Sequence, residues 1–416
     1  MNLADLLKKS LGSTQLDLIR RVADESSALG FPLYLVGGSI RDLLLARPIV
    51  DFDLTLEGDA ITLARSLVKK YSGKLTAHDK FFTATWTPQS SNSQFLDLVS
   101  ARKETYSHPG ALPTVQKSTI DDDLRRRDFT INAMAIRLDG DHFGELFDPL
   151  HGQNDLENKL IRVLHPKSFV DDPTRMFRAI RYAERYEFKL ESETLGLIND
   201  EARGIISELS GERLRHEFDL ILEEPDPSAM LKQLADLHVL KAIHPALSTA
   251  NHQLPTVEEP SPDFGEFAIP DILSFRQTLG WIFYLMDFTE ADIESLAERL
   301  AFPALLSKAI ISASNLKKDL PSFKDWKPSQ WTFHLDELPF LSTYAVYLVT
   351  RESALRDYLA KWQHIKPITT GDDLKARGLE PGPRFGEILR QLRAAWLDGE
   401  VKTKEEEKIL LDRLVK

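Results

Sequence analysis

Cysteine is absent from this chain of 416 residues. Its absence excludes disulfide frameworks, thiol catalysis and zinc sites with Cys ligands, and it is typical of the reducing cytoplasm. The N-terminal residues, MNLADLLKKSLGSTQ, also lack the sustained apolar core of a secretory signal. The most apolar run, TLGWIFYLMDF, is much shorter than the ~20 residues of a membrane helix. We therefore expect a cytoplasmic protein without a membrane partner.

Positively charged residues are fewer than negatively charged ones: the chain has 52 Lys and Arg and 64 Asp and Glu, for a formal net charge of -12. This balance argues mildly against a general nucleic-acid coat protein. It allows a basic cleft on an acidic body, because binding follows the local potential. The length predicts about two to four domains, and a hydrophobic content of 42% is enough for extensive cores.

Strand-like and helical segments alternate in the first third of the chain, and helical periodicity dominates from about residue 150. The expected strands are residues 31–38, 49–56, 74–78, 81–86 and 94–101, and the expected helices of this part are residues 14–29, 39–46 and 58–73. Strands first and helices afterwards predict an α+β protein, with a small mixed sheet before helical domains. The Pro- and Glu-rich stretch 251–270 is either a long surface loop or a boundary.

The segment LYLVGGSIRDLLL, residues 33–45, joins a buried strand to a helix through Gly37 and Gly38. Because the two glycines have no side chains, a phosphate can approach backbone N–H groups at the helix N-terminus. Arg41, one turn into the helix, is placed to contact the same phosphate. The spacing is neither a dinucleotide fingerprint nor a Walker P-loop, and on its own an ordinary turn is an equally good interpretation.

Asp51 and Asp53 stand two residues apart in the segment VDFDL, so both side chains leave one face of the predicted strand. Aspartate is depleted in strands, and two neighbouring carboxylates repel each other unless a cation lies between them. Beside a phosphate-binding turn they indicate Mg²⁺ ions that hold a triphosphate. The alternative is a solvated edge strand. Asp97, in the segment FLDLVSAR, is the natural third carboxylate.

Three arginines precede Asp128 in the segment LRRRDFTINAMAI, residues 124–136, and Asn132 follows four residues later. At this spacing Asp128 and Asn132 share one face of a helix. They are suited there to ribose hydroxyls, while Arg126 or Arg127 faces a phosphate. On this segment alone, a capped helix with a solvated charge run is the better interpretation.

The segment SFVDDPTRMFRAIRYAER, residues 168–185, predicts an amphipathic helix. Asp172 is suited to its N-cap and Pro173 to its first helical position. At ~100° per residue, four arginines fall within one third of the circumference: Arg175, Arg178, Arg181 and Arg185. A capped helix with a solvated basic face accounts for this pattern without any ligand.

In order along the chain, several segments resemble the class II tRNA nucleotidyltransferases, the CCA-adding enzymes. These belong to the polymerase-β-like superfamily, which also holds bacterial poly(A) polymerases. The matching segments are LVGGSIRDLLL, DFD, RRDFTINAMA, FDPLHGQNDLENKLIRVLH, DDPTRMFRAIRYAER and GERLRHEF. They run from about residue 30 to residue 222, and the stretch TTGDDLKARGLEPGPRFGEIL, after residue 366, is similar to the family's C-terminal region. Residues 230–345 carry little that can be matched.

The resemblance implies four domains: a nucleotidyltransferase head over residues 1–140, and a helical neck, body and tail over residues 141–222, 223–345 and 346–416. In the head it assigns three groups of residues. The metal-binding carboxylates are Asp51 and Asp53, with the role of Asp97 less defined. The triphosphate-binding residues are Gly37, Gly38, Ser39, Arg41 and Arg127, and the ribose-binding residues are Asp128 and Asn132.

In the neck, Asp172 and Arg175 match the pair that reads the incoming base, and Asp171 stands where the family more often has Glu. The supporting residues and RNA contacts are Arg178 and Arg181 on the same helix and Glu212 and Arg213 on a helix that braces it. The stretch KETYSHPGALPTVQKSTIDDDL, residues 103–124, matches the flexible segment that members need for the final adenosine.

The implied activity is the template-independent addition of C, C and A to the 3′ end of tRNA, from CTP and ATP with Mg²⁺. A partial enzyme that adds only A, or only C-C, stays an alternative, as does a poly(A) polymerase. The full-length flexible segment argues against C-C only. An inactive RNA-binding module is disfavoured, because it gains nothing from paired carboxylates facing a polyanion.

The base-reading pair has a chemical rationale. Cytosine and adenine present an exocyclic amino donor beside an unprotonated ring nitrogen, whereas uracil and guanine present a carbonyl oxygen beside a ring N–H. A carboxylate acceptor (Asp172) and a guanidinium donor (Arg175), one helical turn apart, suit the first two bases and repel the others. In the tail, Arg384 stands at a helix start suited to an RNA phosphate, although a simple packing helix is equally compatible.

Overall fold

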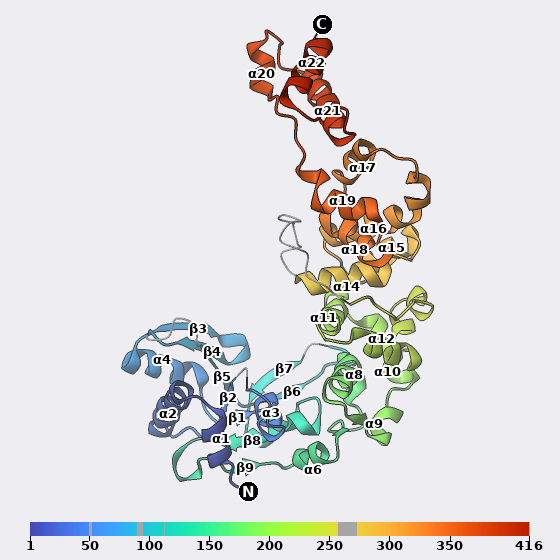
Figure 1. The fold of residues 1–416 in the computed structure, drawn as a ribbon. Coiled ribbons are helices and arrows are strands. Elements are labelled where there is room, and N and C mark those ends of the chain that lie inside the picture. The colour runs from blue at the N-terminus through green and yellow to red at the C-terminus, as the bar shows by residue number, and fades with distance from the viewer. Residues whose placement is uncertain (50–51, 90–94, 112, 257–272, 416) are drawn as a thin grey trace. The chain divides into compact units, whose positions relative to one another are not determined.

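A computed structural model of the protein describes residues 1–49, 52–89, 95–111, 113–256 and 273–415 (Figure 1). The chain forms two compact units. The first consists of Met1–Leu209 with Asp236–Ala242, and the second of Ser210–Ala235 with Ile243–Lys416. The division into head, neck, body and tail stays a prediction.

The first unit contains a seven-stranded sheet with the strand order β3-β4-β5-β2-β1-β8-β9. Its strands are β1 (Leu33–Val36), β2 (Asp53–Leu56), β3 (Lys74–His78), β4 (Thr83–Thr87), β5 (Leu96–Ser100), β8 (Ala135–Arg137) and β9 (Leu146–Phe147). β2 runs parallel to β5 and antiparallel to β1. The strands predicted from the apolar runs are therefore present, each shorter than or equal to its predicted range.

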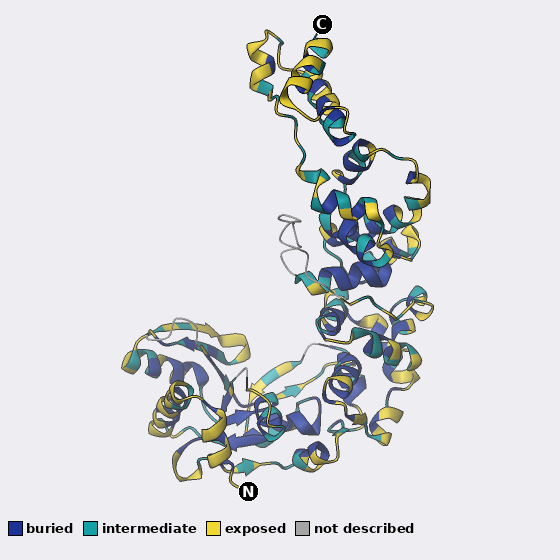
Figure 2. Cartoon of the chain, in the orientation of Figure 1, coloured by how far each residue is buried: buried dark blue, intermediate teal, exposed yellow. Residues whose placement is uncertain are grey.

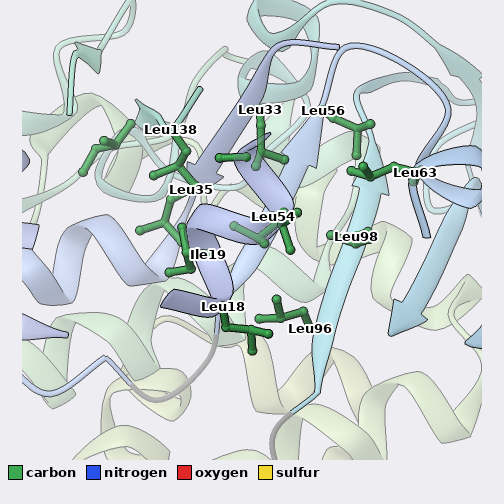
Figure 3. Packing of buried hydrophobic residues seen from close by; sticks show 14 of the residues in the cluster. Leu18, Ile19, Leu33, Leu35, Leu54, Leu56, Leu63, Leu96, Leu98 and Leu138 are labelled. Atoms are coloured by element: carbon green, nitrogen blue, oxygen red, sulfur yellow. The ribbon is translucent and has the colours of Figure 1, made fainter. Parts of the chain in front are cut away.

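One face of the sheet carries the main core of this unit. Leucines of β1, β2 and β5 pack there against Leu18 and Ile19 of α2 (Ser13–Ala28) and Leu63 of α4 (Ala60–Tyr71) (Figure 3). The opposite face carries a smaller cluster that includes Tyr34 and Val36, together with Ile120 and Leu124 of α5 (Ile120–Arg125). Because side chains alternate along a strand, residues next to the core leucines point to this second face.

The predicted strands correspond to β1–β5, so β8 and β9 of the sheet were not predicted, and neither was a separate hairpin. β6 (Arg102–Thr105) and β7 (Thr114–Lys117) pair antiparallel within the stretch assigned to a flexible segment. Their sequences, RKET and TVQK, consist mostly of residues with low strand propensity and have no apolar alternation. The Ser118 N–H donates to the Ala101 carbonyl at 2.7 Å, which extends the β6–β7 ladder by one pair. The Ala101 N–H donates to the Leu56 carbonyl of β2 at 2.8 Å, and Arg102 Nη1 donates to the Phe81 carbonyl, before β4, at 2.9 Å, so the base of the hairpin is attached to the sheet.

Helices make up most of the rest of the first unit. In chain order, the helices that precede β8 are α1 (Ala4–Ser10), α2, α3 (Gly38–Leu44), α4 and α5 (Ile120–Arg125). After it come α6 (Gly152–Glu157), α7 (Ser168–Asp171), α8 (Thr174–Tyr186), α9 (Ser192–Gly196) and α10 (Asp200–Gly204). Between them, β10 (Leu160–Ile161) and β11 (Lys189–Leu190) form a short parallel pair. The α+β order predicted from the sequence is confirmed.

The described residues of the second unit form helices joined by loops, with no strand among them. Its helices are α11 (Gly211–Leu222), α14 (Phe275–Leu285), α15 (Glu290–Arg299), α16 (Ala304–Asp319), α17 (Pro328–Leu335), α18 (Phe340–Thr350), α19 (Ser353–Ala360), α20 (Gly371–Ala376), α21 (Pro383–Leu397) and α22 (Lys404–Val415). α12 (Pro227–Asp236) and α13 (Val239–Ile243) contribute to both units. Most of the stretch 251–270 lies outside the described residues.

The most apolar run of the sequence, TLGWIFYLMDF, lies in the core of this unit. It coincides largely with α14, which is buried along most of its length, as is α18 (Figure 2). Among the residues that the structure describes, none of the helices combines the length and apolar character that crossing a bilayer requires.

Candidate active site

Strand register brings the predicted head residues together at one end of the central strands, which we call this edge of the sheet. β1 and β2 are antiparallel with Leu35 opposite Leu54, so Gly37 follows the end of β1 where Asp53 begins β2. β5 is parallel to β2, with Asp97 opposite Asp53. On its other side, β1 pairs with β8 through Val36 and Ala135. The glycine turn, two carboxylates and the segment before β8 therefore meet at this edge.

Asp53 and Asp97 form a carboxylate pair on neighbouring strands. Both are next to core leucines in sequence, so both side chains leave the sheet on the face opposite the main core. One oxygen of Asp97, Oδ1, accepts a hydrogen bond of 2.6 Å from the Thr85 hydroxyl. Asp51 lies outside the described residues. Within the described ranges, no group of three or more His, Asp and Glu side chains is arranged to hold a metal ion.

The carboxylate pair fits a hard divalent cation. Such ions take oxygen ligands, and Mg²⁺ in particular is usually held by one or two carboxylates together with substrate phosphates. Asp53 is exposed, and Asp97 uses only one of its oxygens in the bond to Thr85. Asp53 and Asp97 are thus the described residues that would hold the ion.

The turn after β1 requires glycine. Gly37 has φ 73° and ψ -134°, and its N–H donates to the Met134 carbonyl at 3.2 Å. A Cβ atom added there would lie 2.5 Å from Nη1 of Arg127. The guanidinium of Arg127 therefore packs against the backbone of the turn, while Gly38 and Ser39 begin α3. The structure thus brings Arg127, rather than Arg126, to the predicted triphosphate-binding turn.

Arg41 is buried and makes several polar contacts. Its Nε and Nη2 donate to the two oxygens of Asp42, each at 3.0 Å, and Nη1 donates to Oδ1 of Asn132 at 2.6 Å. Its guanidinium carbon lies 4.6 Å from the ring centre of Tyr186. Two of its five N–H groups are not used in these bonds. Arg41 therefore links α3 to Asn132, and contact with a phosphate stays a prediction.

The prediction that Asp128 and Asn132 share a helix face is wrong. α5 ends at Arg125, and Phe129 is extended, with φ -133° and ψ 153°, because it forms a β-bridge with Val163. Asn132 ends a short 3-10 helix, Thr130–Asn132. The two side chains still meet, since Nδ2 of Asn132 donates to Oδ1 of Asp128 at 2.9 Å.

Asp128 is also the partner of the arginine-rich helix. Arg178 of α8 donates to Oδ2 of Asp128 from Nε at 2.9 Å and from Nη2 at 2.6 Å. Burial alone would raise the pKa of Asp128, but the Arg178 charge and the hydrogen bonds from Arg178 and Asn132 hold the pKa below its usual value. Asp128 is therefore a charged, buried link between the sheet edge and α8.

The alternative interpretation of the arginine pattern, a solvated basic face on α8, does not hold for most of that face. Arg175 and Arg181 are each only 5% exposed, and the side chain of Arg178 is 33% exposed. Only Arg185, in the last turn, is exposed. Periodicity placed the arginines on one face correctly, but residues from elsewhere in the unit cover that face.

The predicted base-reading pair begins α8. Oδ1 of Asp172 accepts hydrogen bonds from the Thr174 N–H at 3.1 Å and the Thr174 hydroxyl at 2.7 Å. Asp172 is extended and Pro173 has helical backbone angles, as the capping prediction requires. Arg175 donates from Nη1 to the Ser168 hydroxyl at 2.7 Å and from Nη2 to the Arg126 carbonyl at 3.0 Å. The predicted donor is thus held on two sides.

The other predicted site residues lie apart from these contacts. Asp171 ends α7, with its carboxylate 3.9 Å from Nε2 of His165, and its carbonyl accepts from the Gly110 N–H of the β6–β7 hairpin. Burial lowers the pKa of His165, and the Arg175 charge lowers it further. Glu212 and Arg213 are in the first turn of α11, in the second unit, so their bracing role stays a prediction.

Sequence reasoning missed the fully buried Asp123. Its carboxylate accepts from Nε of Arg126 at 2.9 Å and from Nη2 of Arg127 at 3.0 Å, and the Arg102 N–H reaches it at 3.3 Å. Burial alone would raise the pKa of Asp123, but the two guanidinium groups lower it. The signal was its spacing of three and four residues before two arginines, but the residue was assigned to the flexible segment.

Known proteins resemble this chain over almost its whole length. A sequence model described as the poly(A) polymerase head domain matches residues 33–162, and one described as the probable RNA- and SrmB-binding site of polymerase A matches residues 187–251. An A-adding tRNA nucleotidyltransferase of Halalkalibacterium halodurans is 35% identical over 414 residues, which are 97% of this chain and 94% of the relative. The chain belongs to the class II tRNA nucleotidyltransferases.

Two further members of the family show how its named activities vary. A CC-adding tRNA nucleotidyltransferase of Deinococcus radiodurans is 30% identical over 410 residues, which are 95% of this chain and 91% of the relative. The solved apo structure of a CCA-adding enzyme has a TM-score of 0.82 at 30% identity, over 100% of this chain and 98% of that one. The family predicted from the motifs, and the enzyme class, are thus confirmed.

The two family matches cover some of the site residues of this tRNA nucleotidyltransferase and not others. Residues 33–162 contain the glycine turn, the described carboxylates and Asn132. Asp172 and Arg175 fall between the two matched regions, because the first ends at residue 162 and the second begins at residue 187. Their placement beside the head residues rests on the contacts of Arg175 and Arg178 described above.

Proposed function

We propose that this tRNA nucleotidyltransferase adds the terminal A to tRNA that already ends in C-C, with ATP as the nucleotide donor. The observation that carries this specificity is the full-length similarity to the A-adding enzyme, at higher identity than to the CC-adding enzyme. The proposal departs from the first expectation from the sequence, the addition of C, C and A, and takes up its alternative. We also propose that the protein is cytoplasmic, as expected from the sequence and for an enzyme of tRNA processing.

The chemistry is a nucleotidyl transfer. The 3′-hydroxyl of tRNA attacks the α-phosphate of ATP, the new phosphodiester bond forms, and pyrophosphate leaves. Gly38 offers its backbone N–H, at the start of α3, to the triphosphate, Gly37 leaves room at the turn because it has no side chain, and Arg127 places positive charge against the same turn. Asp128 and Asn132 form the ribose-binding unit in this proposal: Asn132 contacts the ribose, and Asp128, whose orientation Arg178 fixes, holds Asn132 in place.

The cofactor in this proposal is Mg²⁺, held by Asp53 with Asp51 and assisted by Asp97. A bound ion neutralises charge on the triphosphate and lowers the pKa of the attacking hydroxyl. The support from the structure is the pairing of Asp53 with Asp97 at the edge that also carries the glycine turn.

Base selection is assigned to Asp172 and Arg175. A carboxylate and a guanidinium accept C and A and reject U and G, so this pair alone does not separate an A-adding from a CCA-adding enzyme. For this reason, full CCA addition stays a second candidate, favoured by the similarity to the solved CCA-adding enzyme over the whole chain.

The test offers three purified tRNAs, which end before C-C, after C-C and after C-C-A, to the full-length protein with ATP, CTP or both. We expect one A on the tRNA that ends in C-C and no transfer to the other two. Incorporation of two C residues and then A into the shortest tRNA would replace this proposal by the second candidate. The Asp53→Ala variant, assayed in parallel, controls for contaminating enzyme.

A further inference from the structure

Arg175 is fixed in place by two acceptors from different elements. Nη1 donates to the Ser168 hydroxyl of α7 at 2.7 Å, and Nη2 donates to the Arg126 carbonyl, after α5, at 3.0 Å. Ser168 is completely buried, and Arg175 is 5% exposed. Hydrogen bonds to a charged group are stronger than those between neutral groups, so these two contacts define the direction of the remaining N–H groups.

Ser168 holds both members of the predicted base-reading pair. While its hydroxyl accepts from Arg175, its backbone carbonyl accepts from the Asp172 N–H at 3.1 Å. The side chain of Asp172 is itself fastened to Thr174. The acceptor and the donor that face the base are thus joined through a single buried residue.

Rigidity matters because a guanidinium only donates. A guanidinium that can turn is able to donate to the ring nitrogen of adenine or cytosine, and equally to the carbonyl oxygen of guanine or uracil, which lies beside it. A guanidinium locked toward the ring-nitrogen position meets the ring N–H of guanine or uracil instead, and two donors repel. Discrimination by Arg175 therefore depends on its orientation as well as its charge.

We propose that Ser168 is a positioning residue for base selection, which fixes Arg175 so that it rejects GTP and UTP. This inference rests on the base-reading role that the proposed function gives to Asp172 and Arg175. The side chain of Ser168 acts only through Arg175, whereas the second acceptor, the Arg126 carbonyl, belongs to the backbone and is present whatever side chain occupies that position.

The experiment measures kcat/KM for ATP, GTP and UTP on tRNA ending in C-C, in wild type, Ser168→Ala, Arg175→Ala and the double variant. We expect Ser168→Ala to lower the ATP preference over GTP and UTP about tenfold, chiefly through faster GTP and UTP incorporation. In the Arg175→Ala background, Ser168→Ala should change the preference no further, because the residue it positions is gone.

A matched control separates this role from a general loss of packing. Ser26 is also completely buried in the first unit, and its hydroxyl donates one hydrogen bond of 2.8 Å to the Phe31 carbonyl. Ser26→Ala should lower the thermal midpoint, because it also removes a buried hydrogen bond, without changing nucleotide preference. If Ser168→Ala does not fold, Ser168→Cys, of similar size but a weak acceptor, takes its place.

Two results would overturn the inference. One is wild-type nucleotide preference in a folded Ser168→Ala or Ser168→Cys variant while Arg175→Ala loses it. The other is an equal further loss of preference when Ser168→Ala is added to Arg175→Ala, because the residue then acts independently. Failure of the proposed function looks different: wild type would transfer no A to tRNA ending in C-C, or Arg175→Ala would keep full preference.

Discussion

Arg178 and Asp128, 50 residues apart in the sequence, form a partly buried ion pair, with both Nε and Nη2 of the arginine donating to Oδ2 of the aspartate. Oδ1 of Asp128 accepts from Asn132 and from the Phe129 N–H. The carboxylate therefore has hydrogen bonds on both oxygens. The pair fastens α8 to the segment that carries the predicted ribose-binding residues.

Replacing Asp128 with Asn should destabilise the first unit. The amide cannot accept from both Arg178 donors as a charged group, and hydrogen bonds to charged groups contribute ~1.5–3 kcal/mol. We expect the free energy of unfolding, measured with urea, to fall by about that amount. The exposed pair of Asp121 and Arg125 is the matched control: Asp121→Asn should cost less than ~0.5 kcal/mol. Equal effects of the two substitutions would contradict the assignment.

The same contact predicts a pH dependence. Because the folded-state pKa of Asp128 lies below its usual value, its stabilising contribution is complete above the unfolded pKa of about 3.9. It is lost as the pH falls through the lower folded pKa. The stability difference between wild type and Asp128→Asn should thus be constant from pH 7 to about 5 and shrink below about 4. A difference that grows on acidification would contradict this sign.

The elements that sequence analysis predicted well are those whose periodicity is local. β1 and β5 are apolar strands that pack in the core, and α4 is an amphipathic helix between Asp59 and Gly73. The β6–β7 hairpin was missed because its strands carry Lys, Glu and Gln and are held by contacts to the sheet. Those contacts come from residues distant in sequence, which periodicity does not report.

In the site, too, the sequence predicted local features and missed features that depend on residues distant in sequence. The motifs identified the family and the glycine turn, whose φ at Gly37 only glycine adopts readily. The spacing of Asp128 and Asn132 was correctly taken as a contact but wrongly as a helix, because the bridge that extends Phe129 involves Val163. The sequence left a solvated basic face on α8 open as an alternative, since no local signal reveals that Ser168 contacts Arg175 and Asp128 contacts Arg178.

Asp53 is the described carboxylate on which the metal proposal depends most. Asp53→Ala should reduce nucleotide transfer to a few per cent of wild type or less and leave tRNA binding nearly unchanged, because the ion rather than an RNA contact is lost. Asp97→Ala should mainly raise the Mg²⁺ concentration needed for half-maximal activity. The exposed Asp79→Ala is the control. Substantial transfer by Asp53→Ala at any Mg²⁺ concentration would refute the assignment.

The tail is proposed to bind tRNA through a groove between α17 and α21, within the second unit. The groove, of about 530 Å³, is lined by residues that include Phe333, Lys366 and Arg390. Arg390 lies over the Phe333 ring at 4.4 Å, whereas Arg393 is bonded to Asp336 and the Ile365 carbonyl. Lys366 and Arg390 are therefore better candidates for RNA phosphate than Arg384, which donates to the Val415 carbonyl.

Lys366→Ala and Arg390→Ala should each raise KM for tRNA and leave KM for ATP unchanged. Each lost phosphate contact should also lower the slope of log Kd for tRNA against log salt concentration by about one. Lys408→Ala, at an exposed position of α22, serves as the control. Point variants are preferable to truncation near residue 365, because removing the tail also removes the hydrogen bonds of Asp398 to Ser329 of α17. An unchanged salt slope would exclude the groove as an RNA contact.

Asp172 offers the sharpest test of the base-reading proposal, because its capping and reading roles use different chemistry. Oδ1 accepts from the Thr174 N–H and hydroxyl, and asparagine keeps that oxygen and is an equally good N-cap. The second oxygen becomes an amide donor. This N–H group would repel the amino group of adenine or cytosine and donate a hydrogen bond to the carbonyl oxygen of guanine or uracil.

Asp172→Asn should therefore fold with a thermal midpoint close to that of wild type and lose nucleotide preference. One good base contact is worth ~1–3 kcal/mol, so we expect the ratio of kcat/KM for ATP to that for GTP to fall about tenfold or more. Asp226→Asn is the matched control, since Asp226 also accepts from a backbone N–H at a helix start, in the second unit. A simple cap predicts that both substitutions are harmless. Full selectivity in a folded Asp172→Asn enzyme would show that the first turn of α8 does not read the base.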